Sequence, residues 1–259
     1  MSRKLLKIAD SLVNAVIIIL LCIGSLYLAY SLWDNRQVLD EAQSMQDDLL
    51  KLKPDRCASF ANLKKVNEDV TAWLEINSTN IDYPVVQGKD NSEYLNKNVY
   101  KEFALAGSIF LDARNASDFS DPYSLIYGHH MAEGKMFGDL DLFTDQSFFE
   151  QNKTGKLTVE GGYYPLTVLG VMETEESDQK IFDPTVYTVP GESIYPYIKS
   201  GSKFIHSKEV QEAASKNRKV LALTTCVDES SARTVVFAGL GDFQPAVCEA
   251  GSSPDGGRG

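Results

Sequence analysis

The chain has 259 residues, of which 43% are hydrophobic and 24% are charged, a composition typical of one large globular domain or two small ones. Acidic residues outnumber basic ones by 36 to 25, so the formal net charge at pH 7 is −11. An acidic chain without a basic stripe and interleaved aromatic residues argues against a nucleic-acid partner. We therefore expect a protein that does not bind nucleic acid.

Residues 11–33, "SLVNAVIIILLCIGSLYLAYSLW", form an apolar run without a charged residue. A helix needs about 20 apolar residues to cross a bilayer, so the run predicts a transmembrane anchor after a cytoplasmic segment at residues 1–10. A buried core helix rarely stays uncharged on every face for this length, and a cleaved signal peptide has a shorter apolar core and a small-residue cleavage site. Because Arg3, Lys4 and Lys7 precede the run, we expect a single-pass protein of the cell membrane, with a cytoplasmic N-terminus and the remaining chain on the extracellular face.

Charged, helix-prone sequence follows at residues 34–59, interrupted by Pro54. Apolar residues such as Met45 and Leu49 recur at roughly helical spacing. The segment predicts a helical stalk or linker, although a disordered spacer is an alternative for residues 34 to about 56. The rest divides into a domain at residues 60–245 and a tail at residues 246–259, whose end, "GSSPDGGRG", is flexible in composition.

Short runs of β-branched and aromatic residues follow, separated by turn signals such as "NSTN", "QGKDN" and "VDESSA". About eight such runs with irregular connections favour a closed barrel or a sandwich, mainly β, over a parallel α/β sheet. Helices are expected between them at residues 92–100, 136–145 and 193–204. The runs that we expect to be strands are residues 73–76, 81–86, 107–112, 124–128, 155–162, 163–173, 219–226 and 233–243.

The four cysteines are unevenly placed, since Cys22 lies in the apolar run and Cys57, Cys226 and Cys248 follow it. Outside the membrane the number is odd, so at least one thiol is free or paired with another chain. A Cys57–Cys248 disulfide is one hypothesis. A free thiol outside the cell raises the question of a chemical role.

Cys226 follows the apolar run "VLALTT", and Arg233 begins the next apolar run seven residues later. So short a connection predicts antiparallel neighbouring strands, with Cys226 and Arg233 close together at one edge of the sheet. A nearby cation lowers the pKa of a thiol and favours the nucleophilic thiolate. A guanidinium can also stabilise the oxyanion that forms when a thiolate attacks a carbonyl group. The alternatives are a small buried cysteine and a surface arginine.

Such a nucleophile needs an acid or base, usually histidine, and the chain has three: His129, His130 and His206. His129 and His130 follow the glycine that ends the run "SLIYG", a common place for functional side chains on a rigid scaffold. His206 lies in the polar connection "KFIHSKEV", and we expect it to be a solvated loop residue. The residues alone leave open which histidine, if any, acts with Cys226.

These motifs together resemble those of the sortases, the cell-surface cysteine transpeptidases of Gram-positive bacteria. The segment "ALTTC" is similar to their TLxTC motif, with Ala222 in place of its first threonine, and an arginine follows seven residues later. "GHHMAEGKMFGDLDLF" is similar to the GHxMxxGxMFxxL pattern of class B sortases. The segments "YPVVQ", "DNSEYL" and "GSIFLD" resemble other segments of the same class. The resemblance spans residues 60–243. It implies a closed sortase-like β-barrel of about eight strands with N-terminal and inserted helices, preceded by one transmembrane helix.

The resemblance also implies roles for individual residues. Cys226 corresponds to the nucleophile, His129 to the acid and base, and Arg233 to the residue that steadies the substrate and its oxyanion. His130 then has no essential chemical role. Asp228 is a candidate for the acidic residue that class B members often carry soon after the cysteine, and Thr225 is a candidate supporting residue.

The implied reaction is transpeptidation through a thioester. The enzyme cleaves a C-terminal sorting signal, LPxTG-like or NPxTN-like, of a surface protein or pilin. The acyl group then passes to an amine of a peptidoglycan cross-bridge, a lipid-linked precursor or a pilin lysine, which gives cell wall anchoring or pilus assembly. This chemistry needs no cofactor and no metal, and we interpret the acidic run "ETEESD" as a solvated loop rather than a calcium site. The alternatives are a thiol protease, a hydrolase that releases surface proteins, and a catalytically idle domain that binds them.

Overall fold

The computed structural model describes residues 3–54, 57–225 and 232–246, and the chain divides into two compact units, Met1–Glu41 and Ala42–Gly259. Helix α1 is continuous over Arg3–Leu50, so the expected anchor and most of the expected stalk belong to one helix. Among the described residues, its part at Lys7–Leu50 is the one helix long and apolar enough to cross a membrane.

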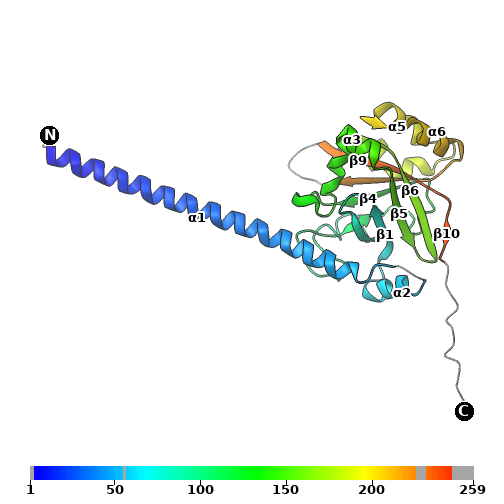
Figure 1. Ribbon diagram of the computed structural model, residues 1–259, viewed down its shortest axis with the longest axis horizontal. Helices are drawn as coiled ribbons and strands as arrows, with labels where there is room; N and C mark the ends of the chain where they lie inside the picture. The colour runs from blue at the N-terminus through cyan, green and yellow to red at the C-terminus, as the bar shows by residue number, and fades with distance from the viewer. Residues whose placement is uncertain (1–2, 55–56, 226–231, 247–259) are drawn as a thin grey trace, which may run out of the picture. The chain divides into compact units, whose positions relative to one another are not determined.

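Eight strands form a closed β-barrel, as the sequence predicts (Figure 1). Their order around the barrel is β6, β5, β1, β2, β3, β4, β8 and β9, and the pairing of β9 with β6 closes the ring. Each expected strand overlaps one of them. The bounds are β1 (Val70–Ile76), β2 (Asp82–Val86), β3 (Ile109–Leu111), β4 (Tyr123–Gly128), β5 (Thr154–Val159), β6 (Gly162–Glu175), β8 (Val220–Thr225) and β9 (Ala232–Leu240). The two-residue strands β7 (Phe204–Ile205) and β10 (Gln244–Pro245) pair with β6 beside the ring.

Two strand pairs of the ring are parallel, β2 with β3 and β4 with β8, and the other neighbours are antiparallel. A parallel pair needs a long crossover connection, and residues 129–219 supply it between β4 and β8. Gly128 and Thr225, the last residues of these two strands, are paired. Both strands therefore end at the same edge of the barrel.

Short helices fill the connections between the strands, and one more, α2, precedes β1. The helices expected at residues 136–145 and 193–204 correspond to η2 and α5. The bounds are α2 (Cys57–Val66), η1 (Ala132–Gly134), η2 (Gly138–Thr144), α3 (Gln146–Gln151), α4 (Gln179–Phe182), η3 (Pro184–Thr188), α5 (Tyr195–Gly201) and α6 (Ser207–Ser215).

The helix expected at residues 92–100 is wrong, because this segment consists of turns. The side chain of Asp90 accepts hydrogen bonds from the backbone amides of Ser92 and Glu93, as an N-cap residue does, but the turn does not continue into a helix. The chain then folds back, so that Lys97 pairs with Phe103 in an isolated bridge.

Much of the barrel wall is buried on both faces, because alternate residues of a strand belong to two hydrophobic clusters, although only Leu157 of β5 is buried. Leu223 and Val236 belong to the cluster that fills the barrel and continues into η2 and α3. Ala222 and Val235 belong to the outer cluster, which includes residues of α2, α5 and α6. Helices α5 and α6 both contact β6 (Figure 1). A strand covered on both faces reads as a nearly continuous apolar run, as "VLALTT" does in β8.

Candidate active site

The ends of β4 and β8 form the centre of the candidate site. All residues of both strands are buried, and Gly128 pairs with Thr225. His129 directly follows β4 and is half-buried, while Cys226 directly follows Thr225 in the sequence. Cys226 and Asp228 lie outside the described residues, as do Cys248 and the side chain of Cys57. The nucleophile, the role of Asp228 and the disulfide between Cys57 and Cys248 therefore stay predictions.

His129 is held by the connection between β2 and β3. Its Nε2 atom lies 2.7 Å from the carbonyl oxygen of Leu95. A carbonyl oxygen can only accept a hydrogen bond, so Nε2 is the donor in this contact. The backbone is held as well, since the amide of Phe137 donates to the carbonyl oxygen of His129 at 2.9 Å. These two contacts fix the orientation of the imidazole at the end of β4.

His130 has a different partner. It is exposed, and its Nε2 atom lies 2.8 Å from Oδ2 of Asp141 in η2. The other oxygen of Asp141 accepts a hydrogen bond from the Thr234 hydroxyl group at 2.8 Å. Thr234 lies in β9 directly after Arg233, so His130 belongs to a link between η2 and β9. It takes no part in the Leu95 contact that holds His129.

Arg233 lies near the beginning of β9, where its register partner on β6 is Thr174. Its side chain is only 8% exposed, so the surface-arginine alternative is wrong. The guanidinium forms an ion pair with Glu176 at 2.9 Å and lies over the Phe182 ring, 5.1 Å from the ring centre. The antiparallel pairing of β8 with β9 is confirmed, and it puts Arg233 on the strand next to Thr225.

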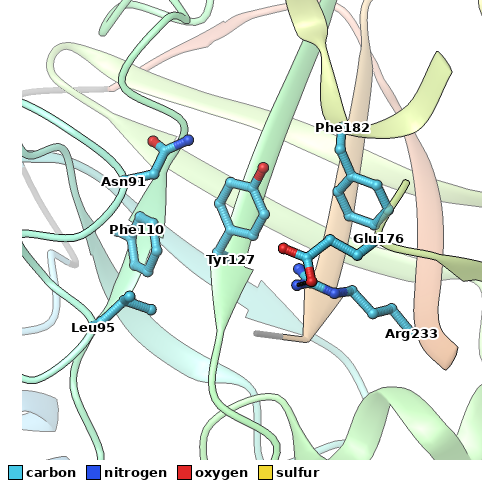
Figure 2. Close-up of a pocket in the computed structure, with 7 residues that line it drawn as sticks. All are labelled: Asn91, Leu95, Phe110, Tyr127, Glu176, Phe182 and Arg233. Carbon is cyan, nitrogen blue, oxygen red and sulfur yellow. Dashed lines mark ion pairs between the residues drawn. The ribbon is translucent and has the colours of Figure 1, made fainter. Parts of the chain in front are cut away.

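A pocket of about 280 Å³ opens beside these residues (Figure 2). Figure 2 shows the Tyr127 ring between Phe110 on one side and the Glu176–Arg233 ion pair on the other. Burial and the negative charge of Asp112 raise the pKa of Tyr127, so its hydroxyl group stays protonated and donates to Asp112 Oδ2 at 3.1 Å. The lining residues are Asn91, Leu95, Phe110, Tyr127, Glu176, Phe182 and Arg233.

Of the predicted site residues, the structure brings Thr225 and Arg233 onto neighbouring strands and sets His129 beyond the end of a third. Sequence reasoning missed the other pocket residues. Tyr127 had a signal, since it lies in β4 two residues before His129, and residues two apart along an extended chain share a face. Leu95 and Phe182 gave no signal, because they lie in connections between strands and are distant in sequence from the other site residues.

The acidic run at residues 173–178 is largely exposed, but its first three residues belong to β6 and not to a loop, and several of its carboxylates have specific partners. Glu176 pairs with Arg233, and Asp178 caps α4 and accepts a hydrogen bond from the Tyr197 hydroxyl group. Within residues 3–54, 57–225 and 232–246, no group of three His, Cys, Asp or Glu side chains is placed to hold a metal ion.

The expectation for His206 is wrong, because this residue is buried and only 7% exposed. Its ring stacks on Phe149 of α3 with centroids 4.1 Å apart, and Nε2 lies 3.1 Å from the Phe149 carbonyl oxygen. The polar neighbours of His206 in the sequence did not indicate this packing, because its partner Phe149 lies 57 residues earlier in the chain. His206 is therefore a core histidine and does not line the pocket.

Comparison with known proteins agrees with this geometry. A family model described as a sortase domain matches residues 74–241. Sortase B of Listeria monocytogenes is 33% identical over 200 residues, which cover 75% of this chain and 79% of that protein. The X-ray structure of Clostridium perfringens sortase B is similar with a TM-score of 0.60 and 32% identity, over 70% of this chain and 99% of that chain. The structure of a Streptococcus pyogenes class B sortase involved in pilus biogenesis has a TM-score of 0.59 and 36% identity, over 70% of this chain and 97% of that chain.

The matched region runs from β1 to the end of β9, and so it contains the closed barrel and both strand ends of the candidate site. The similar solved structures have the same fold at more than 30% identity. The resemblance read from the sequence is thereby confirmed. This chain belongs to the sortase family, and it is a class B sortase, a cysteine transpeptidase that acts on sorting-signal substrates.

Proposed function

We propose that Cys226, His129 and Arg233 carry out the transpeptidation. The observation that supports this assignment is the pairing of Gly128 with Thr225, because His129 and Cys226 are the next residues after these two. Neighbouring strands lie about 4.8 Å apart, so side chains that follow two paired strand ends can meet. The buried guanidinium of Arg233, on the strand antiparallel to β8, supplies positive charge beside them.

In the first half-reaction, the Cys226 thiolate attacks the carbonyl carbon of the threonine in the sorting signal. Negative charge develops on the carbonyl oxygen, and the Arg233 guanidinium stabilises it. The peptide C–N bond breaks as His129 gives a proton to the leaving amine, and a thioester remains. In the second half-reaction, an acceptor amine attacks the thioester and loses a proton to His129, and Cys226 leaves as a thiolate.

Two supporting residues belong to the same proposal. Thr225 is buried and paired with Gly128, and so it fixes the strand end from which Cys226 follows. Asp228 provides the acidic residue that class B members often carry after the cysteine. The proposal needs no further group to balance either half-reaction.

The substrate in this proposal is a surface protein or pilin with an LPxTG-like or NPxTN-like signal near its C-terminus. The similar Streptococcus pyogenes enzyme is involved in pilus biogenesis, which supports a pilin lysine as acceptor. An amine of a peptidoglycan cross-bridge or of its lipid-linked precursor is the acceptor with equivalent chemistry. Both acceptors attack the same thioester.

Sortases are cell-surface enzymes, and α1 is a candidate membrane anchor. We propose a single-pass protein with a cytoplasmic N-terminus at residues 1–10, a span at 11–33, a stalk at 34–59, an extracellular catalytic domain at 60–245 and a tail at 246–259. Tethering the enzyme beside substrates that are also held at the membrane raises their effective concentration.

The test uses the full chain in detergent micelles, as wild type and as Cys226→Ala. Each is incubated with LPxTG and NPxTN peptides, with and without an oligoglycine amine, and the products are identified by mass spectrometry. We expect Cys226-dependent cleavage after threonine and an amide product when the amine is present. Acid product alone in the presence of amine would support the thiol protease. No cleavage, together with an unreactive Cys226 thiol, would support a binding domain.

A further inference from the structure

Arg114 and Asp112 form a forked ion pair beside the pocket. The Nε atom of Arg114 lies 2.9 Å from Oδ1 of Asp112, and its Nη2 atom lies 2.7 Å from Oδ2. Asp112 is fully buried. Burial opposes its charged form, but hydrogen bonds from Arg114 and Asn91 hold the pKa of Asp112 below its ordinary value. The carboxylate is therefore a charged acceptor at neutral pH.

Asp112 holds one wall of the pocket. Its Oδ2 atom accepts hydrogen bonds from the Asn91 amide at 2.8 Å and from the Tyr127 hydroxyl group at 3.1 Å. Asn91 and Tyr127 both line the pocket (Figure 2). Asn91 and Tyr127 come from different parts of the chain, and the buried Asp112 carboxylate holds both through the same oxygen atom.

Arg114 holds the opposite wall. Its Nη2 atom donates a hydrogen bond of 2.6 Å to the carbonyl oxygen of Phe182, and its Nη1 atom lies 3.4 Å from Asp183 Oδ1. Phe182 ends α4, in the connection between β6 and β7, whereas Arg114 lies in the connection between β3 and β4. One guanidinium thus joins the Asp112 wall to the segment that carries the Phe182 ring.

Arg233 depends on that ring for its position. Within the described part of the chain its ion-pair partner is Glu176, whose side chain is 67% exposed. Exposed ion pairs restrain their members weakly. The Phe182 ring, 5.1 Å from the guanidinium carbon, gives the planar group a second contact that favours one orientation of its plane. The location of Phe182 therefore influences where the Arg233 charge lies in the pocket.

We propose that Arg114 is a positioning residue of the transpeptidation, which holds the Phe182 backbone so that the Phe182 ring orients the guanidinium of Arg233. The inference rests on the proposed function, since it takes Arg233 as the group that stabilises the oxyanion. Lysine cannot replace Arg114, because a single ammonium group cannot bond both Asp112 oxygens and the Phe182 carbonyl oxygen in the same fixed geometry.

The test is Arg114→Lys in the full chain, assayed on the best peptide of the wild type. We expect kcat to fall about tenfold or more, because the charge-assisted hydrogen bond from Arg114 to the Phe182 carbonyl oxygen is lost and Arg233 is then less well oriented. We expect KM to change less than about threefold. The matched control is Arg218→Lys. Arg218 makes a comparable fork with Asp242, with atoms 3.2 and 3.0 Å apart, but does not line the pocket. An unchanged kcat in Arg114→Lys, or an equal loss in Arg218→Lys, would overturn the proposal.

A double variant separates positioning from a general effect on the fold. If Arg114 acts through Phe182, then Arg114→Lys combined with Phe182→Leu lowers kcat no further than the more severe single change. If Arg114 only stabilises the fold, the two losses multiply, and the proposal is wrong. Thermal unfolding of each variant is measured alongside.

Hydrogen exchange gives a readout that does not need activity. The amides of Ile181, Phe182 and Asp183 are hydrogen-bonded within α4, and we expect them to exchange about tenfold faster in Arg114→Lys and at the wild-type rate in Arg218→Lys. If the proposed function fails, the wild type itself gives no Cys226-dependent product, but exchange still reports whether Arg114 holds this segment. Unchanged exchange in Arg114→Lys would refute the positioning role in either case.

Discussion

Gly128 and Thr225 are paired residues at the ends of two parallel strands, β4 and β8. Each directly precedes a residue of the proposed catalytic pair, His129 and Cys226. The pairing depends on a close approach at Gly128, because a Cβ atom there would lie 2.4 Å from Ile109 Cδ1 and 2.8 Å from the Phe137 ring. The glycine of the "GHH" motif is therefore a packing requirement that sets the position of His129.

This contact predicts that Gly128→Ala is destabilising. Ile109 and Phe137 are buried, so an added methyl group forces the strand or the core to shift, and we expect the free energy of unfolding to fall by about 1–3 kcal/mol. Urea unfolding of the full chain in micelles measures the change. Gly239→Ala in β9 is the control, because a Cβ atom there meets its nearest neighbours at 3.5 Å. Equal stability of the two variants would contradict the packing argument.

Substitutions of the two adjacent histidines should affect kcat very differently. His129→Ala should lower kcat at least about a hundredfold, since it removes the proposed acid and base. His130→Ala should lower it less than about threefold, because it removes only an exposed contact with Asp141, whose side chain is 53% exposed. Peptide cleavage assays compare both with the wild type. A severe loss in His130→Ala would show that the Asp141–Thr234 link matters for the reaction.

Arg233→Lys should lower kcat about a hundredfold to a thousandfold. Lysine keeps the positive charge but loses the planar guanidinium group and its packing on Phe182. Losses of this size follow removal of an oxyanion donor. The unfolding midpoint is measured alongside the cleavage rate, because Arg233 is buried. Wild-type activity in Arg233→Lys would mean that charge alone, without its orientation, is sufficient.

Glu176→Gln should raise kcat/KM by about twofold to fivefold. The carboxylate partly neutralises the Arg233 guanidinium at 2.9 Å, and an ion pair as exposed as this one contributes up to about 1 kcal/mol. The rise should shrink at high salt, because salt already screens an exposed pair. Cleavage rates at low and high salt concentrations test this, and a fall in kcat/KM would instead make Glu176 a required part of the site.

The sequence predicted the barrel strands because each is a short run of β-branched and aromatic residues between turn signals. The run "VLALTT" has four successive apolar residues before its two threonines, since β8 is buried on both faces. Which strands would be neighbours was harder to predict. The short connection between Thr225 and Arg233 predicted the β8–β9 pair, but the β4–β8 pair depends on a crossover of residues 129–219, whose path no local pattern encodes.

In the pocket, too, contacts between distant parts of the chain could not be predicted from local sequence patterns. His129 and Arg233 stood out because each follows or begins an apolar run, whereas Phe182 and Leu95 matter through contacts made across long chain separations. The contact of Arg114 with the Phe182 carbonyl oxygen spans 68 residues. The helix expected at residues 92–100 failed although the Asp90 side chain bonds the amides of Ser92 and Glu93 as an N-cap does, because the chain folds back to pair Lys97 with Phe103.

His206 predicts how stability depends on pH. Burial, and then the positive charge of Lys153, lower the pKa of His206 below its ordinary value of 6.5. The unfolded chain then binds a proton at higher pH than the folded chain, so the free energy of unfolding is highest above about pH 6.5 and falls as the pH decreases below it. Each unit of difference between the two pKa values corresponds to about 1.4 kcal/mol.

The measurement is urea unfolding of the wild type and of His206→Gln at several pH values between 5.5 and 8. Glutamine keeps an NH group for the Phe149 carbonyl oxygen but does not titrate. We expect the wild type to lose more stability than His206→Gln between pH 7 and 5.5, while both stay constant from pH 7 to 8. Parallel curves over the whole range would mean that His206 takes up its proton equally well in both states, and the argument from its burial against Phe149 would be wrong.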